Sequence, residues 1–285
     1  MGGQKEFFSE VAVSYSQAKV IILPVPYGRS YSSRGGTENA PGAIFEVSDN
    51  LEMWDEETGG EVSRLGLATL PSIENVLEWE LLKKLVSEQV KRVYKDGKFL
   101  ITIGGDHIVT IPVISNIKKF FPANPGVVYL DAHTDCRNVY QGSFYSHACV
   151  ARRIIEEEKV PLVLTGVRSF SREEWEFIKR EKISLFPGNQ FVIKMKEIFD
   201  LLPSFVYVSI DVDVFDPAII PAVTCPEPGG VLWQEMLLFL RQLAIYKKIV
   251  GFDVVELAPI AGLDYPQFTV AKLIYKFLSY IFLSS

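Results

Sequence analysis

The chain has 285 residues, of which 48% are hydrophobic and 22% are charged, and its formal net charge is −6 at pH 7. A chain of this length can bury one large core, so we expect a single domain over residues 1–285. The acidic balance, with basic residues scattered rather than clustered, argues against a nucleic-acid partner.

Apolar runs alternate with segments of helical periodicity along most of the chain. The runs predicted to be strands are 20–23, 99–103, 126–130, 161–165, 205–210 and 249–255. The predicted helices are 77–94, 147–158, 171–181, 233–244 and 267–283. This alternation predicts an α/β fold, a three-layer α/β/α sandwich with a mostly parallel sheet. Two Gly- and Pro-rich segments, 26–42 and 217–230, are expected to be loops at the rim of a cleft.

The two ends of the chain and its cysteines bear on where the protein works. Residues 1–10 are polar, unlike a secretory signal. The apolar tail 268–283 is too short to span a bilayer and contains Lys272 and Lys276, so no membrane partner is expected. Three widely separated cysteines do not suggest a disulfide framework. We therefore expect a cytoplasmic protein.

Side chains that bind metals gather in three short clusters, each following a predicted strand. The clusters are His107; Asp131, His133 and Asp135; and Asp211 and Asp213. Residues two apart on extended backbone project from one face. In open α/β sheets, ligands bind beyond the carboxyl ends of the strands, so the three clusters are expected to meet in one cleft.

The chemistry of these clusters favours a pair of metal ions. An unpaired buried carboxylate costs roughly several kcal/mol and therefore needs a cation or many hydrogen bonds. A single Asp after a strand can equally be a helix N-cap. For four aspartates interleaved with two histidines, a two-metal site is the better interpretation, and the oxygen-rich set suits manganese(II) better than zinc.

The motifs that carry these residues resemble those of the ureohydrolases, the arginase and agmatinase family. The resemblance rests on three signatures in the family's order, at residues 104–107, 131–135 and 209–217, and it extends from 24–27 through 36–44 to 253–259. Residues 145–148 and 166–169 look more like the agmatinase branch than the arginase branch. Residue 108 and the run 221–225 depart from the family pattern. The second departure lies near the expected cleft, so it bears on the choice of substrate and not on the metal chemistry.

The resemblance implies an arginase-like fold, two manganese(II) ions and a homo-oligomer, either trimer or hexamer. Asp131 and Asp211 would then bridge both metals, with His107 and Asp135 completing one metal and His133 and Asp213 the other. His147 matches the family histidine that shuttles a proton, and Glu256 matches the carboxylate that holds the guanidinium. The simpler readings are a capping or surface histidine and a glutamate in a structural salt bridge.

The implied activity is the hydrolysis of a small guanidino compound to urea and an amine, with agmatine, which gives putrescine, as the favoured substrate. Arginine and guanidinobutyrate are the alternatives within this chemistry. A relative that binds metal or a partner without turnover is the alternative outside it. A single-zinc deacetylase on a related fold is disfavoured, because it would not need both His107 and the full 131–135 set.

Overall fold

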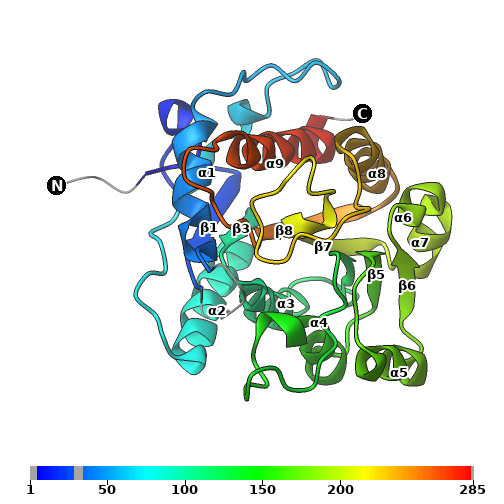
Figure 1. Ribbon diagram of the computed structural model, residues 1–285. Coiled ribbons are helices and arrows are strands. Elements are labelled where there is room, and N and C mark those ends of the chain that lie inside the picture. Colours follow the sequence, from blue (N-terminus) through cyan, green and yellow to red (C-terminus); the bar gives the residue numbers. More distant parts are fainter. Residues whose placement is uncertain (1–4, 29–34, 284–285) are drawn as a thin grey trace.

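The computed structural model describes residues 5–28 and 35–283 and shows a central sheet with helices on both faces (Figure 1). Within these residues, eight parallel strands form one sheet in the order β2-β1-β3-β8-β7-β4-β5-β6. The strands are β1 (Val20–Val25), β2 (Leu67–Thr69), β3 (Phe99–Gly104), β4 (Gly126–Leu130), β5 (Leu162–Val167), β6 (Ser184–Pro187), β7 (Phe205–Asp211) and β8 (Lys248–Val255).

Successive side chains of the central strands pack into two different apolar cores, one on each face of the sheet. In β4, for example, Val128 and Leu130 join one core, and Val127 and Tyr129 join the other. A strand that is buried on both faces has no polar side, which is why these segments read as continuous apolar runs in the sequence.

The helices divide between the two faces. One core takes in residues of α1, α6, α7, α8 and α9, and the other takes in residues of α2, α3, α4 and α5. Their bounds are α1 (Ala40–Ser48), α2 (Trp79–Lys95), α3 (Thr110–Ile117), α4 (Val150–Arg153), α5 (Arg172–Glu181), α6 (Gln190–Ile193), α7 (Met195–Leu201), α8 (Trp233–Tyr246) and α9 (Tyr265–Leu283). The predicted three-layer sandwich is confirmed, and its sheet is parallel throughout the described residues.

The register of the four middle strands sets the position of everything that follows them. Ile103 pairs with Val254, Val254 pairs with Ile210, and Ile210 pairs with Leu130. These residues form one row across β3, β8, β7 and β4. The segments that leave this row therefore emerge side by side at the carboxyl edge of the sheet.

Some local predictions were wrong. Segment 26–42 is not a single loop, because one turn forms at Thr37–Asn39 and α1 begins at Ala40; residues 29–34 lie outside the described part. Segment 147–158 is not one regular helix but a 3₁₀ turn (His147–Cys149), α4, and a π-helical turn (Ile154–Glu158). Among the described helices, none is both long and apolar enough to cross a membrane.

Candidate metal centre and cleft

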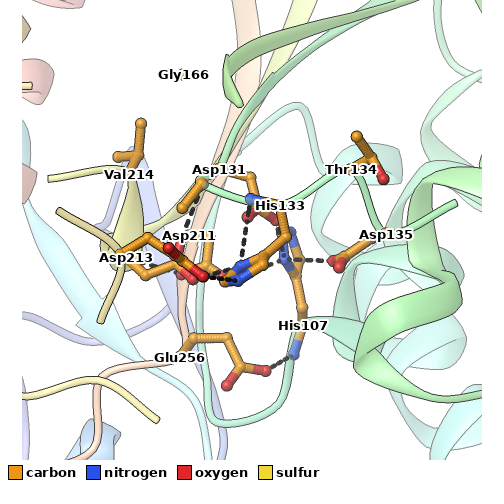
Figure 2. A network of polar contacts seen from close by, with 12 residues as sticks. His107, Asp131, His133, Thr134, Asp135, Gly166, Asp211, Asp213, Val214 and Glu256 are labelled. Carbon is orange, nitrogen blue, oxygen red and sulfur yellow. Dashed lines mark hydrogen bonds and ion pairs between the residues drawn. The ribbon is translucent and has the colours of Figure 1, made fainter. Parts of the chain in front are cut away.

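The three predicted clusters come together at the carboxyl edge of β3, β7 and β4 (Figure 2). One ligand atom each from His107, Asp131 and Asp135 can be chosen so that all lie within 4.8 Å of one another. The same holds for Asp131, His133 and Asp213. Asp131 belongs to both groups, so the two candidate metal positions are adjacent and share a carboxylate.

Asp211 joins the first group through its Oδ2 atom. This atom lies 3.3 Å from Nδ1 of His107, which is also 3.3 Å from Oδ2 of Asp131 and 3.4 Å from Oδ2 of Asp135. In the second group, Nδ1 of His133 lies 2.8 Å from Oδ2 of Asp213. The imidazoles thus face the carboxylate oxygens, as they would around shared cations.

The backbone that carries the ligands is extended only in part. Asp211 ends β7 in an extended conformation and His133 forms a β-bridge with Ser169, but the backbone at Asp135 is left-handed with φ of 48° and Asp213 lies in a 3₁₀ turn (Val212–Val214). A left-handed backbone is uncommon for a residue with a side chain, and such conformations cluster at functional sites. Glu256 is the other candidate site residue with this backbone, with φ of 65°.

Backbone hydrogen bonds fix the orientation of three of the four carboxylates. Asp131 Oδ1 accepts a hydrogen bond from His133 N (2.5 Å), Asp211 Oδ1 from Asp213 N (2.8 Å), and Asp213 Oδ1 from Ala132 N (2.9 Å). Asp131 and Asp211 therefore each use one oxygen to hold their own turn, and Asp213 uses one to hold the segment that follows β4. The other oxygen points toward an imidazole and is left to bind a cation.

The electrostatics of the centre call for added positive charge. Burial, followed by the neighbouring Asp135 and Asp213 carboxylates, raises the pKa of Asp131 to about 7. Burial, followed by Asp213 and Asp131, holds the pKa of Asp211 well above its usual range. For His133, burial lowers the pKa, but Asp213 and Asp131 outweigh it and hold the pKa well above its usual range.

The residues present fit divalent cations. Oδ2 of Asp131 is buried and accepts no hydrogen bond from any described residue. Four carboxylates with two imidazoles as counter-charges leave net negative charge in a largely buried site, which is unfavourable without a cation. Oxygen ligands together with imidazole suit manganese, among other divalent transition metals.

The paired glycines of the first cluster allow the backbone to pack closely. A Cβ at Gly105 would collide with the carbonyl oxygen of Tyr27. The carbonyl of Gly105 accepts a hydrogen bond from Glu256 N (2.8 Å), which ties the turn after β3 to the end of β8. A side chain at position 105 would therefore displace the turn that carries His107.

Glu256 lies under the metal centre and is buried. Its Oε1 accepts a hydrogen bond from the backbone N–H of His107 at 2.8 Å (Figure 2). Burial, followed by Asp106 and Asp211, raises its pKa well above the usual range. Within the described residues no Lys, Arg or His forms an ion pair with Glu256, so the structural salt bridge that was the alternative reading is not found there.

His147 lies away from both candidate metal groups, on the wall of a cavity of about 330 Å³. Its ring meets Tyr140 edge to face, with centroids 5.3 Å apart, and its Nδ1 is 3.3 Å from Oγ of Ser146. The cavity is also lined by His133, Asp135, Asp211, Asp213 and Glu256. The structure therefore places both predicted catalytic residues and four of the six predicted metal ligands around one space.

Of the two loops predicted to rim the cleft, only the later one, 217–230, contributes described residues to the lining of this cavity. In the later loop, Thr224 and Cys225 line the cavity, as predicted. The described residues of segment 26–42 do not; Pro26 and Pro41 line a separate hollow with Pro24. Ile108, which departs from the family pattern, is buried in the apolar core around α2 and α3.

Arg168 has a structural role that was not predicted from the sequence, although the stretch 166–169 that contains it contributed to the resemblance. The Arg168 guanidinium donates hydrogen bonds to the carbonyl oxygens of Gly166, Asp213, Val214, Phe215 and Glu227. It thereby joins the turn that carries a candidate metal ligand to a cavity-lining loop. Apart from the bond to Gly166, these bonds are to backbone carbonyls of distant segments, so no sequence pattern could have indicated them.

Further contacts hold the His107 imidazole on the side of its Nε2 atom, which is turned away from the carboxylates of the centre. Its Nε2 lies 2.9 Å from Oγ of Ser209, which donates to Oδ1 of the buried Asp253 (2.7 Å). Tyr207 donates to the other oxygen of Asp253. Such outer contacts orient an imidazole and set which of its nitrogens faces the metal.

Comparison with known proteins gives a consistent result along nearly the whole chain. Residues 18–279 match the sequence profile of the Arginase family. The N(1)-aminopropylagmatine ureohydrolase of Synechocystis sp. is 35% identical over 289 residues, which cover 98% of this chain and 94% of that protein. The agmatinase of Pyrococcus horikoshii is 33% identical over 266 residues, 92% of each chain.

A solved structure agrees with these sequence matches. The crystal structure of the agmatine ureohydrolase of Thermoplasma volcanium has a TM-score of 0.86 to this chain at 30% sequence identity. The match covers 99% of this chain and 95% of that one. The similarity therefore includes the central sheet and the segments that leave its carboxyl edge.

Proposed function

This chain belongs to the arginase family of ureohydrolases, and we propose that it is a binuclear manganese enzyme that hydrolyses agmatine to urea and putrescine. The observation that carries the proposal is the shared position of Asp131 in two adjacent ligand groups. A single-metal enzyme would need only one of these groups.

The ligand assignment follows the two groups. Asp131 and Asp211 would contact both cations, His107 and Asp135 would complete one position, and His133 and Asp213 the other. Support for Asp131 is its buried Oδ2, which has no hydrogen-bond donor. Support for Asp211 is its Oδ2, 3.3 Å from His107, while its Oδ1 is engaged with the turn of Asp213. The predominance of hard oxygen donors is the reason to propose manganese over zinc.

When bound, such a pair of cations lowers the pKa of water toward neutrality and so supplies hydroxide to attack the guanidino carbon. Glu256 would hold the guanidinium beside the metal centre, since it is a buried carboxylate on the cavity wall without a cationic partner among the described residues. His147, on the same wall and outside both ligand groups, would deliver a proton to the leaving amine nitrogen. Hydrolysis then breaks the bond between the carbon and that nitrogen.

The charges around the cavity favour a substrate with a cationic tail over one with a carboxylate. Among the described lining residues, Arg137 is the single Lys or Arg, and its Nε lies 3.8 Å from Oε2 of Glu174. The α-carboxylate of arginine would therefore find no unpaired basic side chain in this lining, whereas agmatine carries only an amine. We expect kcat/KM for agmatine to exceed that for arginine by at least about tenfold, which needs only about 1.4 kcal/mol of differential transition-state binding.

A second candidate substrate is N(1)-aminopropylagmatine, because a relative at 35% identity over 98% of this chain carries that activity in its name. It presents the same guanidino group with a longer tail bearing two amines. The metal centre and Glu256 would serve both substrates equally. The difference between them lies at the mouth of the cavity.

The test is urea release by the manganese-loaded protein from agmatine, N(1)-aminopropylagmatine, arginine and guanidinobutyrate. The highest kcat/KM should be for agmatine. A higher value for the aminopropyl compound, or for arginine, would replace the substrate but keep the chemistry. No urea from any of the four would overturn the proposed function.

A matched pair of variants ties the activity to the cleft. Glu256→Gln should lower kcat/KM by about 30-fold or more, because truncating one partner of a buried charge pair costs about 2–5 kcal/mol. Glu197→Gln makes the same change on the surface, where the side chain is 58% exposed, and should leave kcat/KM unchanged. Equal effects of the two changes would contradict the role given to Glu256.

The proposal extends to the setting of the enzyme: one ureohydrolase domain over residues 1–285, assembled as a cytoplasmic trimer or hexamer. Support for a reducing compartment comes from the three cysteines, which are all free. Light scattering on the purified protein tests the assembly. A monomer with full activity would contradict it.

A further inference from the structure

Tyr129 is a buried residue of β4 whose hydroxyl reaches the metal centre from the side of α2 and α3. It donates a hydrogen bond to Oδ2 of Asp135 at 2.7 Å and lies 3.0 Å from Nδ1 of His107. Its ring is stacked on the His107 imidazole, with centroids 4.5 Å apart and planes within 4° of parallel. One side chain therefore touches both residues that are specific to the first ligand group.

Asp135 depends on this contact more than the other acidic ligands depend on any single side chain. Asp131, Asp211 and Asp213 each accept a hydrogen bond from a backbone N–H. In the part of the chain that the structure describes, no backbone N–H donates to the Asp135 carboxylate, and its hydrogen-bond donor is the Tyr129 hydroxyl. The left-handed backbone at Asp135 also breaks the extended path that would have aimed its side chain.

We propose that Tyr129 is a positioning residue for one of the two metal ions: its hydroxyl sets the Asp135 carboxylate, and its ring sets the plane of His107. The inference rests on the proposed function, because it assumes that Asp135 and His107 are ligands. Outer groups that orient metal ligands contribute about 10–100-fold to metal affinity. The hydrogen bond and ring contact of Tyr129 reach His107 and Asp135 but neither His133 nor Asp213, the residues specific to the second group, so we expect its effect to fall on the first ion.

The position of Tyr129 explains why a hydroxylated aromatic residue serves here better than an aliphatic one. Val127, the other residue of β4 in the same core, only packs against apolar neighbours. Tyr129, two residues later and nearer the carboxyl edge, combines the same burial with a hydroxyl that reaches beyond the strand end. The strand thus supplies both core packing and ligand orientation on one face.

The test is calorimetric titration of manganese(II) into protein that has been stripped of metal by chelator, comparing wild type with Tyr129→Phe. This change removes the hydroxyl and keeps the stacked ring. One of the two binding events should weaken by about 10–100-fold and the other should stay within about threefold. Asp135→Asn identifies the affected event, because it removes a ligand of the same group.

Tyr94→Phe is the matched control. Tyr94 is also a buried tyrosine, and its hydroxyl donates to the backbone carbonyl of Val250 at 2.9 Å, in β8 near its start. The Tyr94→Phe variant should lower the melting temperature of the metal-free protein about as much as Tyr129→Phe does. It should leave both manganese affinities within about threefold of wild type. This pair separates ligand positioning from the general loss of a buried hydrogen bond.

Several outcomes would overturn the inference. Tyr129→Phe with both affinities like wild type, or with both weakened equally, would show that the hydroxyl does not position one ligand group. The inference would also be overturned if Tyr94→Phe weakened the same manganese-binding event as strongly as Tyr129→Phe does. Wild-type protein that binds fewer than two ions would overturn the proposed function and this inference together, so the two failures are distinguishable.

Discussion

Arg168→Met removes every side-chain donor that Arg168 provides between two loops beside the metal centre, while keeping a long apolar stem. In the folded protein, the guanidinium makes six hydrogen bonds to five carbonyl oxygens at distances from 2.7 to 3.3 Å. The carbonyl of Val214 has a second donor, Val231 N. Within the described residues, the carbonyl oxygens of Asp213, Phe215 and Glu227 accept no backbone hydrogen bond in the turns and loops, so Arg168 is their donor there.

The expected loss of stability follows from these three carbonyls. A hydrogen bond to a charged group contributes about 1.5–3 kcal/mol net, so three of them would contribute at least about 4.5 kcal/mol if water were excluded. Arg168 is only half-buried, and water can reach part of the space left by the change. We therefore expect a loss of about 2–4 kcal/mol in the free energy of unfolding, a large share of the usual 5–15 kcal/mol.

Thermal unfolding followed by circular dichroism measures this loss, with Arg172→Met as the control. Arg172 is four residues along the chain, its side chain is 91% exposed, and it pairs with Glu176 on the surface of α5. Surface pairs of this kind contribute little. Arg172→Met should leave the melting temperature unchanged, and Arg168→Met should lower it by roughly 5–15 °C, given about 2–4 °C per kcal/mol for a large domain.

The same variant should also bind manganese more weakly, because Arg168 holds the carbonyl of Asp213 and thereby the turn that carries this carboxylate. Arg168→Lys, with three donors in place of a planar fork, should fall between Arg168→Met and wild type. If Arg168→Met melts within 1 °C or so of wild type and keeps its metal content, the reasoning from these carbonyls is refuted.

Three further predictions concern the centre itself. Dialysis against a chelator should abolish urea release, and manganese(II) should restore it better than zinc; full activity in protein shown by elemental analysis to contain no transition metal would contradict this. Asp131→Asn and Asp211→Asn should lower metal content and turnover more than Asp213→Asn, because a carboxylate shared by two cations neutralises both; equal losses in the three variants would rule out the shared roles. His147→Asn should keep near-normal metal content while kcat falls by about 10²–10⁴-fold, as for general acid and base groups; a variant that loses its metals would identify His147 as a ligand.

Short or wholly buried elements were the ones that sequence patterns did not predict. α3 (Thr110–Ile117) has buried residues on every side and carries Pro112, so it lacks the polar stripe that marks a surface helix. The edge strands β2 and β6 have three and four residues, too few for a periodic signal. The start of α1 contains Pro41 and Gly42, which also suit a loop.

The sequence by itself determined the alternation of strands and helices, and the residue types at the strand ends. Continuous apolar runs such as Gly126–Leu130 are the direct consequence of burial on both faces of the sheet. Because of this burial, they can be recognised as strands from the sequence. The carboxylates and imidazoles that follow them are unusual enough at such positions to indicate a metal site. This much needs only local chemistry and spacing.

Tertiary structure alone decided which of these ends became neighbours. The strand order places β8, the last strand in the sequence, between β3 and β7, and this brings Glu256 under His107 and beside the aspartates. No local pattern contains that order, because strand pairing depends on contacts between residues far apart in the chain. The contacts of Arg168 and Tyr129 arise in the same way: each joins segments that meet only once the sheet has formed, through backbone carbonyls and a ligand carboxylate that spacing cannot locate.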